Sequence, residues 1–294
     1  MHAGFAMLSA GAIRSKNTQN ILLCTTLDLC TCAIAWFLTG FGFAFGEDNG
    51  DGFIGTTYFV GLNVGSWSQG ALQQTSGQGV SMAFWFFEFA FAATSATIVA
   101  GAVAERARFE TYMVYSFVAS AFTYPVIVHW IWGGGFLTMG SANPVLNLGA
   151  LDFAGDGPVH MIGGISGMIA SKIMGPRIGR FDKDGNAQPI PGHSSSLVNL
   201  GTFCLWFGWL GFNPGSIITV TSGGSLIMSR AAVNTVLCPA ASTISALFFA
   251  YYYNPRRVFD FGIAMNGALA GLVAITSNCG AFFGFFVSLR ALRF

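Results

Sequence analysis

The sequence predicts an all-α integral membrane protein built as a helical bundle. Of the 294 residues, 53% are hydrophobic and only 9% are charged, whereas soluble domains carry about 25% charged residues. The apolar residues fall in runs of about 20 to 25, long enough for a helix to cross the hydrocarbon core. The longest polar stretches, near 47–79 and 176–196, are rich in glycine, serine and proline and lack periodicity. We therefore expect one membrane domain over residues 1–294 and no soluble domain.

Seven apolar runs are each long enough to form a complete transmembrane helix. In chain order they cover residues 21–46, 80–104, 111–135, 157–175, 197–221, 231–253 and 260–280. Residues 3–13 are apolar but too short to cross, and residues 281–294 end before another span is complete. We therefore expect about seven complete helices with a partial helix at each end. No basic segment and cleavable apolar run follow Met1, so no signal peptide is expected.

Basic residues occupy alternate loops between these runs. They are Arg14 and Lys16, then Arg106 and Arg108, then Lys172, Arg177, Arg180 and Lys183, then Arg256 and Arg257. The other loops hold only Arg230, beside the acidic Glu47, Asp48, Asp51 and Asp156. The positive-inside rule makes the first set cytoplasmic, which places the amino terminus outside. The net charge of +1 argues against a nucleic-acid partner.

The six cysteines lie in or beside the apolar runs. They are Cys24, Cys30, Cys32, Cys204, Cys238 and Cys279. No CxxC pair and no His/Cys spacing suited to zinc is present. We interpret them as small buried residues and expect no structural disulfide, no metal site and no cofactor.

His160 is an ionisable residue inside a segment that otherwise resembles a lipid-buried helix. An imidazole in hydrocarbon costs free energy unless it faces a packed interior or a pore, so an intramembrane histidine is a functional-site candidate. The alternative is a histidine hydrogen-bonded to a neighbouring helix. Pro158 fits the first turn of this helix, which Asp156 or Gly157 can cap. Asp152, in the preceding loop, either attracts a cation or orders the loop.

Aromatic side chains crowd the run that contains Phe87 and Phe91, which share one helix face at i, i+4. The simpler interpretation is contact with lipid or with the protein core. The functional interpretation is a pair of stacked rings that gates a pore, with Trp132 and Phe212 opposite. Such rings hold a small cation through their quadrupoles, worth about 0.5 to 2 kcal/mol.

Two carboxylates, Asp28 and Glu88, lie within apolar runs and must face protein rather than lipid. We expect structural hydrogen-bonding roles for both, with a proton relay as the alternative. Two pairs of glycines spaced four apart, Gly163 with Gly167 and Gly267 with Gly271, predict close helix packing.

Several of these strings resemble the ammonium transporter (Amt/Mep/Rh) family, and its Amt branch most closely. They are Ala102-Val103-Ala104-Glu105-Arg106, His129-Trp130-Ile131-Trp132-Gly133-Gly134-Gly135, Asp152-Phe153-Ala154-Gly155 and Gly208-Trp209-Leu210-Gly211-Phe212-Asn213-Pro214-Gly215-Ser216. The resemblance runs in order from about residue 4 to residue 280. It implies an eleven-helix bundle of two inverted five-helix repeats, assembled as a homotrimer with a pore through each subunit.

The resemblance also implies roles for particular residues. Phe87, Trp132 and Ser216 match the outer site that recruits ammonium, and Asp152 matches the aspartate that shapes the outer vestibule. Phe91 and Phe212 match the phenylalanine gate, and His160 matches the first of two pore histidines. The second pore histidine belongs to a helix beyond the matched region. Asp156 and Pro158 replace smaller or aliphatic residues of the family.

The function expected from both lines of reasoning is ammonium transport. Ammonium docks at the outer site, loses its proton and passes as ammonia, since a bare cation loses hydration that a few rings cannot replace. Alternatives are a truncated, non-conducting fragment and a regulatory or sensor member of the same family. An enzyme is not expected, because no Ser/His/Asp set, HExxH motif or paired catalytic aspartates appear. The expected partners are ammonium or ammonia, membrane lipid and two further copies of the chain, with a multi-pass location in the plasma membrane.

Overall fold

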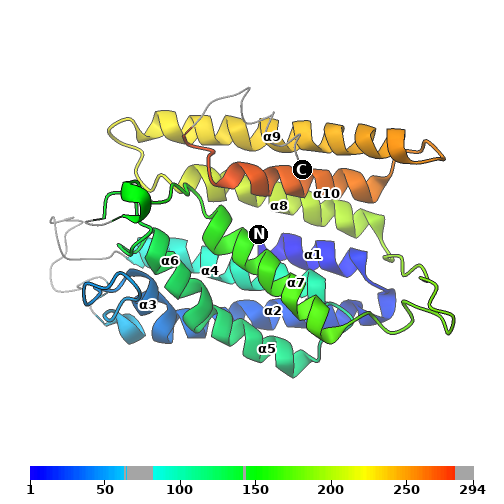
Figure 1. The fold of residues 1–294 in the computed structure, drawn as a ribbon, viewed down its shortest axis with the longest axis horizontal. Helices are drawn as coiled ribbons and strands as arrows, with labels where there is room; N and C mark the ends of the chain where they lie inside the picture. Colours follow the sequence, from blue (N-terminus) through cyan, green and yellow to red (C-terminus); the bar gives the residue numbers. More distant parts are fainter. Residues whose placement is uncertain (63, 65–81, 142–143, 282–294) are drawn as a thin grey trace.

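Long helices that lie side by side make up most of the computed structural model, which describes residues 1–62, 64, 82–141 and 144–281 (Figure 1). The main helices are α1 (His2–Ala12), α2 (Thr18–Ala35), α3 (Phe41–Phe45), α4 (Met82–Val103), α5 (Phe109–Val118), α6 (Tyr124–Ile131), α7 (Ile162–Met174), α8 (Ser195–Gly215), α9 (Gly224–Tyr253) and α10 (Phe261–Thr276). Short 3-10 turns lie at η1 (Ser15–Asn17), η3 (Phe59–Gly61) and η5 (Val145–Asn147). Within these ranges the structure contains no β-strand, only two isolated bridges, so the predicted all-α class is confirmed.

Among the described residues, four helical segments are long and apolar enough to cross a membrane. They are Ser15–Phe45, Met82–Val103, Phe109–Ile131 and Gly224–Tyr253, and the shorter apolar helix Phe261–Thr276 accompanies them. All of them overlap runs predicted from the sequence, although Ser15–Phe45, Phe109–Ile131 and Gly224–Tyr253 begin before the predicted runs 21–46, 111–135 and 231–253. The total of seven complete spans stays a prediction, and the incomplete span expected at 282–294 lies outside the described residues.

Two of these segments are interrupted by one π-helical turn each, η2 (Trp36–Gly40) and η4 (Ala119–Thr123). The η4 turn lies just before Pro125, which has no N–H to donate to the carbonyl of Ala121 four residues earlier. The hydroxyl of Thr39 donates to that carbonyl instead, at 3.0 Å. The side chain from the neighbouring segment therefore satisfies the backbone group that proline leaves unpaired.

Glycines bring the paired helices into close contact, as the spacing predicts. A Cβ added at Gly163 would lie 2.7 Å from the Cβ of Ile98, which couples α7 to α4. One added at Gly271 would lie 2.6 Å from the Cα of Pro239, which couples α10 to α9. Side chains at these positions would push the helices apart.

The loops with basic residues gather at one end of the bundle (Figure 1). The loops that follow α1, α4, α7 and α9 all reach that end, and those that follow α3, α6 and α8 reach the other. At the basic end, Arg14 and Arg177 both pair with Glu105 at 2.9 Å. The loops with basic residues, which alternate with the other loops along the chain, therefore lie together at one end of the bundle.

Burial of the cysteines follows the helix faces. Cys24, Cys32, Cys238 and Cys279 are buried, as predicted. Cys30 is exposed and Cys204 is half-buried, so the prediction is wrong for these two. On α2, Cys24, Asp28 and Cys32 repeat every four residues along the inward face, and Cys30 lies on the opposite face.

Candidate functional site

Four aromatic rings from three segments meet in the core. Phe91 of α4 and Phe212 of α8 stack with their ring centroids 3.9 Å apart and their planes inclined by 23°. Phe87, one turn earlier on α4, lies 4.8 Å from Phe91. Trp132, just after α6, meets Phe91 edge-on at 6.0 Å. The rings that the sequence places opposite one another are therefore in contact, and Phe91 and Phe212 are almost completely buried.

A cavity of about 340 Å³ adjoins this stack. Of the predicted site residues, Phe87, Phe91, Trp132, Asp152 and Ser216 line it. Its wall also includes Met139 and Ile218, whose side chains are exposed, so the cavity opens toward the end that carries the acidic loops. We call this cavity the vestibule.

His160 is buried in the bundle and lies next to Phe212 of the stacked pair, while Phe91 of that pair lines the vestibule. The π-helical turn η6 (Asp156–Met161) carries it directly into α7. Its ring is 6% exposed, stacks on Trp209 at 5.1 Å and lies 5.8 Å from Phe212. The buried Nε2 has no hydrogen-bond partner among the described residues. At this nitrogen, the described residues do not supply the hydrogen bond to a neighbouring helix that the structural alternative requires.

Asp152 orders the loop before η6. Its Oδ1 accepts the backbone N–H of Gly155 at 2.8 Å and of Asp156 at 3.0 Å, and its Oδ2 accepts that of Gly157 at 2.7 Å. Its own carbonyl accepts the indole N–H of Trp132 at 2.8 Å. Of the two roles left open by the sequence, loop ordering is the one that the hydrogen bonds support.

The predicted helix cap is wrong. Gly155, rather than Asp156 or Gly157, occupies the N-cap position, with a φ of 93°. That left-handed conformation suits glycine, and a Cβ at Gly155 would lie 2.8 Å from the indole ring of Trp132. The sequence places Pro158 correctly in the first turn.

Ser216 ends α8 just after Pro214, at the rim of the vestibule. Its hydroxyl donates to the carbonyl of Phe212 at 2.8 Å. Because the proton is used in this way, the oxygen faces a ligand as an acceptor.

The two intramembrane carboxylates differ. Asp28 is fully buried and accepts hydrogen bonds from the hydroxyls of Thr97 and Ser116, with His2 Nε2 3.4 Å away. This is the structural role that was predicted. Glu88 is 4% exposed and lines the vestibule, and its Oε2 has no partner among the described residues. The structural role predicted for Glu88 is therefore not seen at that oxygen.

Sequence reasoning missed Glu88 as a vestibule residue. The signal was its spacing: it follows Phe87 directly and precedes Phe91 by three residues, so Glu88 and Phe91 share a helix face.

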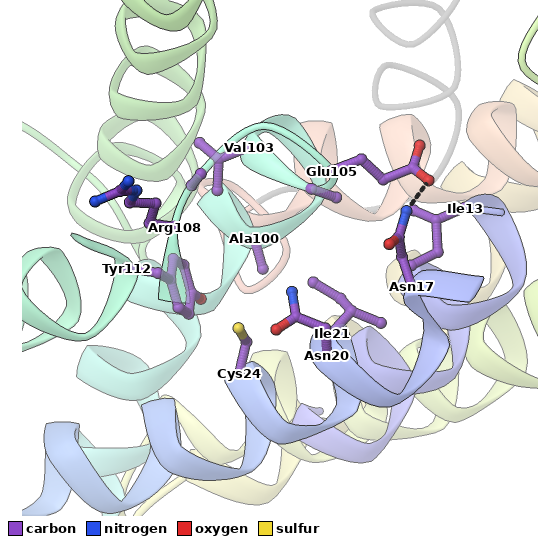
Figure 2. A pocket seen from close by; sticks show the side chains of 12 residues that line it. Ile13, Asn17, Asn20, Ile21, Cys24, Ala100, Val103, Glu105, Arg108 and Tyr112 are labelled. Carbon is purple, nitrogen blue, oxygen red and sulfur yellow. Dashed lines mark hydrogen bonds between the residues drawn. The ribbon is translucent and has the colours of Figure 1, made fainter. Parts of the chain in front are cut away.

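Another, much smaller cavity lies at the basic end (Figure 2). Its volume is about 20 Å³, enough for about one water molecule. Asn20, Cys24 and Tyr112 surround it, and Glu105 at its edge accepts a hydrogen bond from Asn17 (Figure 2). None of the predicted site residues lines this cavity.

The sequence model of the Ammonium Transporter Family matches residues 1–286. Among curated proteins, the chain is 43% identical over 281 residues to "Ammonium transporter Amt2" of Archaeoglobus fulgidus. It is 40% identical over 292 residues to "Ammonium transporter 1 member 3" of Solanum lycopersicum. Each alignment covers 95% of this chain, but only 56% and 59% of these two relatives.

Solved structures of similar sequence share the fold, and two of them serve as examples. One, described as "Sensor Amt Protein", superposes with a TM-score of 0.86 at 35% identity, over 99% of this chain and 68% of that chain. The other, Mep2 of Saccharomyces cerevisiae, gives a TM-score of 0.82 at 29% identity, over 99% and 62%. The chain thus spans a little over half the length of the curated relatives and about two thirds of the solved chains.

Proposed function

Because this chain belongs to the Ammonium Transporter Family, we propose that it transports ammonium across a membrane. Ammonium enters the vestibule and docks beside Phe87, Trp132 and Ser216, near Asp152. It gives up its proton there and passes as ammonia between Phe91 and Phe212 toward His160. The relatives "Ammonium transporter Amt2" and "Ammonium transporter 1 member 3" support this substrate.

The stack of Phe91 on Phe212 is the observation that carries the proposal. It separates the vestibule from His160, since Phe91 lines the vestibule and Phe212 contacts the imidazole. A hydrated cation does not fit between rings 3.9 Å apart, so the rings must part for any solute to pass.

The apolar surroundings of the stack favour passage of the neutral species. Ionised groups lose strong hydration when they enter an apolar, water-excluded region, and ring faces replace only part of it. Ammonia carries no charge and loses far less hydration free energy when it enters such a region. Ammonium can release a proton and potassium cannot, so deprotonation separates two cations of similar size.

The chain is a multi-pass membrane protein, as the family and its long apolar helices indicate. We place its basic end in the cytoplasm and the vestibule outside, following the positive-inside rule. The amino terminus of α1 then faces outward, the membrane is the plasma membrane, and three lipid-embedded copies form a homotrimer.

One comparison favours a second candidate function. The structure described as "Sensor Amt Protein" has a TM-score of 0.86 against this chain. In a sensor, ammonium would occupy the same vestibule, and the protein would report occupancy to a partner instead of conducting. Uptake measurements separate the two functions, because a sensor binds ammonium without transporting it.

Growth of a transporter-deficient host on limiting ammonium tests the proposal. We expect the protein to restore growth, and His160→Ala to reduce methylammonium uptake at least about tenfold, equivalent to about 1.4 kcal/mol. Unchanged uptake and selectivity in that variant would contradict the role of His160. Failure of the unsubstituted protein to restore growth, with ammonium binding retained, would favour the sensor.

A further inference from the structure

Glu88 is a buried carboxylate with an unused acceptor at the wall of the vestibule. The side chain is 4% exposed, and its Oε2 has no hydrogen-bond partner among the described residues. None of the ion pairs among the described residues involves Glu88. Buried polar groups are almost always hydrogen-bonded, so an unpartnered oxygen beside a cavity calls for a ligand or a solvent molecule.

The other polar groups of the vestibule already have partners. The two oxygens of Asp152 receive three backbone N–H groups, and the hydroxyl proton of Ser216 is donated to Phe212. The indole N–H of Trp132 is donated to the carbonyl of Asp152. Glu88 is therefore the vestibule carboxylate with an acceptor to spare.

The neighbours of Glu88 suit a small cation that carries N–H donors. Phe87 and Phe91 flank it on α4, and both rings line the same cavity. Ring faces attract a cation but accept no strong hydrogen bond, whereas a carboxylate supplies both charge and acceptor. An ionised carboxylate that is buried without a partner is strongly disfavoured, and a bound cation removes that penalty.

We propose that Glu88 is a direct ligand of ammonium in the vestibule, with its carboxylate accepting one of the N–H groups of the ion. This inference rests on the proposed function and adds a residue to it. Phe87, Trp132 and Ser216 then surround the cation. Glu88 supplies the negative charge, because the carboxylate of Asp152 is already bound to backbone N–H groups of its own loop.

Ammonium binding to the reconstituted protein tests the proposal. Trp132 lies in the vestibule, so its fluorescence reports a titration with ammonium chloride, with sodium chloride as the control. We expect Glu88→Gln, which keeps shape and removes charge, to weaken ammonium binding at least about tenfold. The matched control Glu110→Gln, in the first turn of α5 at the basic end, should leave the affinity unchanged.

Each outcome is informative. If the unsubstituted protein binds or transports ammonium and Glu88→Gln has the same affinity within about twofold, the role of Glu88 is overturned and the proposed function stands. If the unsubstituted protein neither binds nor transports ammonium, both are overturned. If Glu88→Gln does not fold, Glu88→Asp replaces it, because the shorter side chain withdraws the charge from the cavity. Weaker binding then supports the proposal, and an unchanged affinity overturns it.

Discussion

Two buried glutamates at opposite ends of α4 have contrasting surroundings. Glu105 follows the helix at the basic end, and its carboxylate accepts hydrogen bonds from Arg14, Asn17 and Arg177. Glu88, about 25 Å away along the helix, has an oxygen with no partner among the described residues. The carboxylate of Glu105 therefore has hydrogen-bond partners for both oxygens, whereas Oε2 of Glu88 has none among the described residues.

The difference separates a structural carboxylate from one that is available to a ligand. Burial alone would raise the pKa of Glu105, but the hydrogen bonds from Arg14, Asn17 and Arg177 outweigh it and lower the pKa to about 2. These bonds tie together three loops, those that follow α1, α4 and α7. Among the described residues, no hydrogen bond joins Glu88 Oε2 to another segment, so the presence of this carboxylate in an apolar helix needs another explanation, and the vestibule supplies one.

Removal of Glu105 should have the largest effect on stability. Glu105→Ala leaves Arg14 and Arg177, each about a third exposed, without their carboxylate, and loss of hydrogen bonds to a charged group costs about 1.5 to 3 kcal/mol. We expect a marked fall in the midpoint of thermal unfolding in detergent. Glu110→Ala, at an exposed position in the first turn of α5, is the control and should change the midpoint little. Equal midpoints for the two variants would remove the contrast between the glutamates.

Acid should weaken the same cluster. The pKa of Glu105 is about 2 in the fold and about 4.3 when unfolded, so its contribution is complete above about pH 5 and is lost as pH falls toward 2. The loss amounts to at most about 3 kcal/mol, and solvent screening of the partly exposed arginines reduces it. The measurement is the difference in unfolding midpoint between the unsubstituted protein and Glu105→Gln at each pH. A difference that stays constant from pH 6 to pH 3 would contradict the ion-pair account.

Replacement of Glu88 by an apolar residue should act in the opposite direction. Glu88→Leu removes a buried polar group whose Oε2 is unpartnered among the described residues, and because such a group costs free energy to bury, its replacement by an apolar side chain should be neutral or stabilising. We expect an unchanged or higher unfolding midpoint together with weaker ammonium transport. A midpoint as low as that of Glu105→Ala would show that Glu88 has structural partners after all.

Asn17→Ala should give the smallest effect. Its amide donates one hydrogen bond to Glu105 at 2.5 Å, while both arginines remain in place. We expect a loss of about 1 kcal/mol in unfolding free energy. A loss as large as that of Glu105→Ala would mean that the amide, and not the ion pairs, holds the three loops together.

The sequence predicts the helices and the gathering of aromatic rings well because both depend on local spacing. Phe87 and Phe91 are one turn apart, and burial of an apolar face needs no long-range detail. The alternation of basic loops likewise fixes which loops share an end. Spacing alone left contact with lipid or core as the simpler interpretation of these rings, and the resemblance favoured a common site that includes Trp132 and Phe212.

The sequence could not show which buried carboxylate would find partners. Asp28 and Glu88 look alike in apolar runs, yet Asp28 meets two hydroxyls from other helices and Glu88 meets a cavity. That outcome depends on the rotation of α2 and α4 in the bundle. The loop before η6 was mispredicted for a similar reason, since Gly155 and Asp152 complete the cap through a turn that helix statistics do not describe.

The concentration dependence of methylammonium uptake by reconstituted protein tests the contrast between the two glutamates most directly. For Glu88→Gln we predict a half-saturating concentration at least about tenfold higher, with the unfolding midpoint retained. For Glu105→Gln we predict a lower midpoint and an unchanged half-saturating concentration. A Glu88→Gln protein that saturates at the same concentration as the unsubstituted protein would contradict the account.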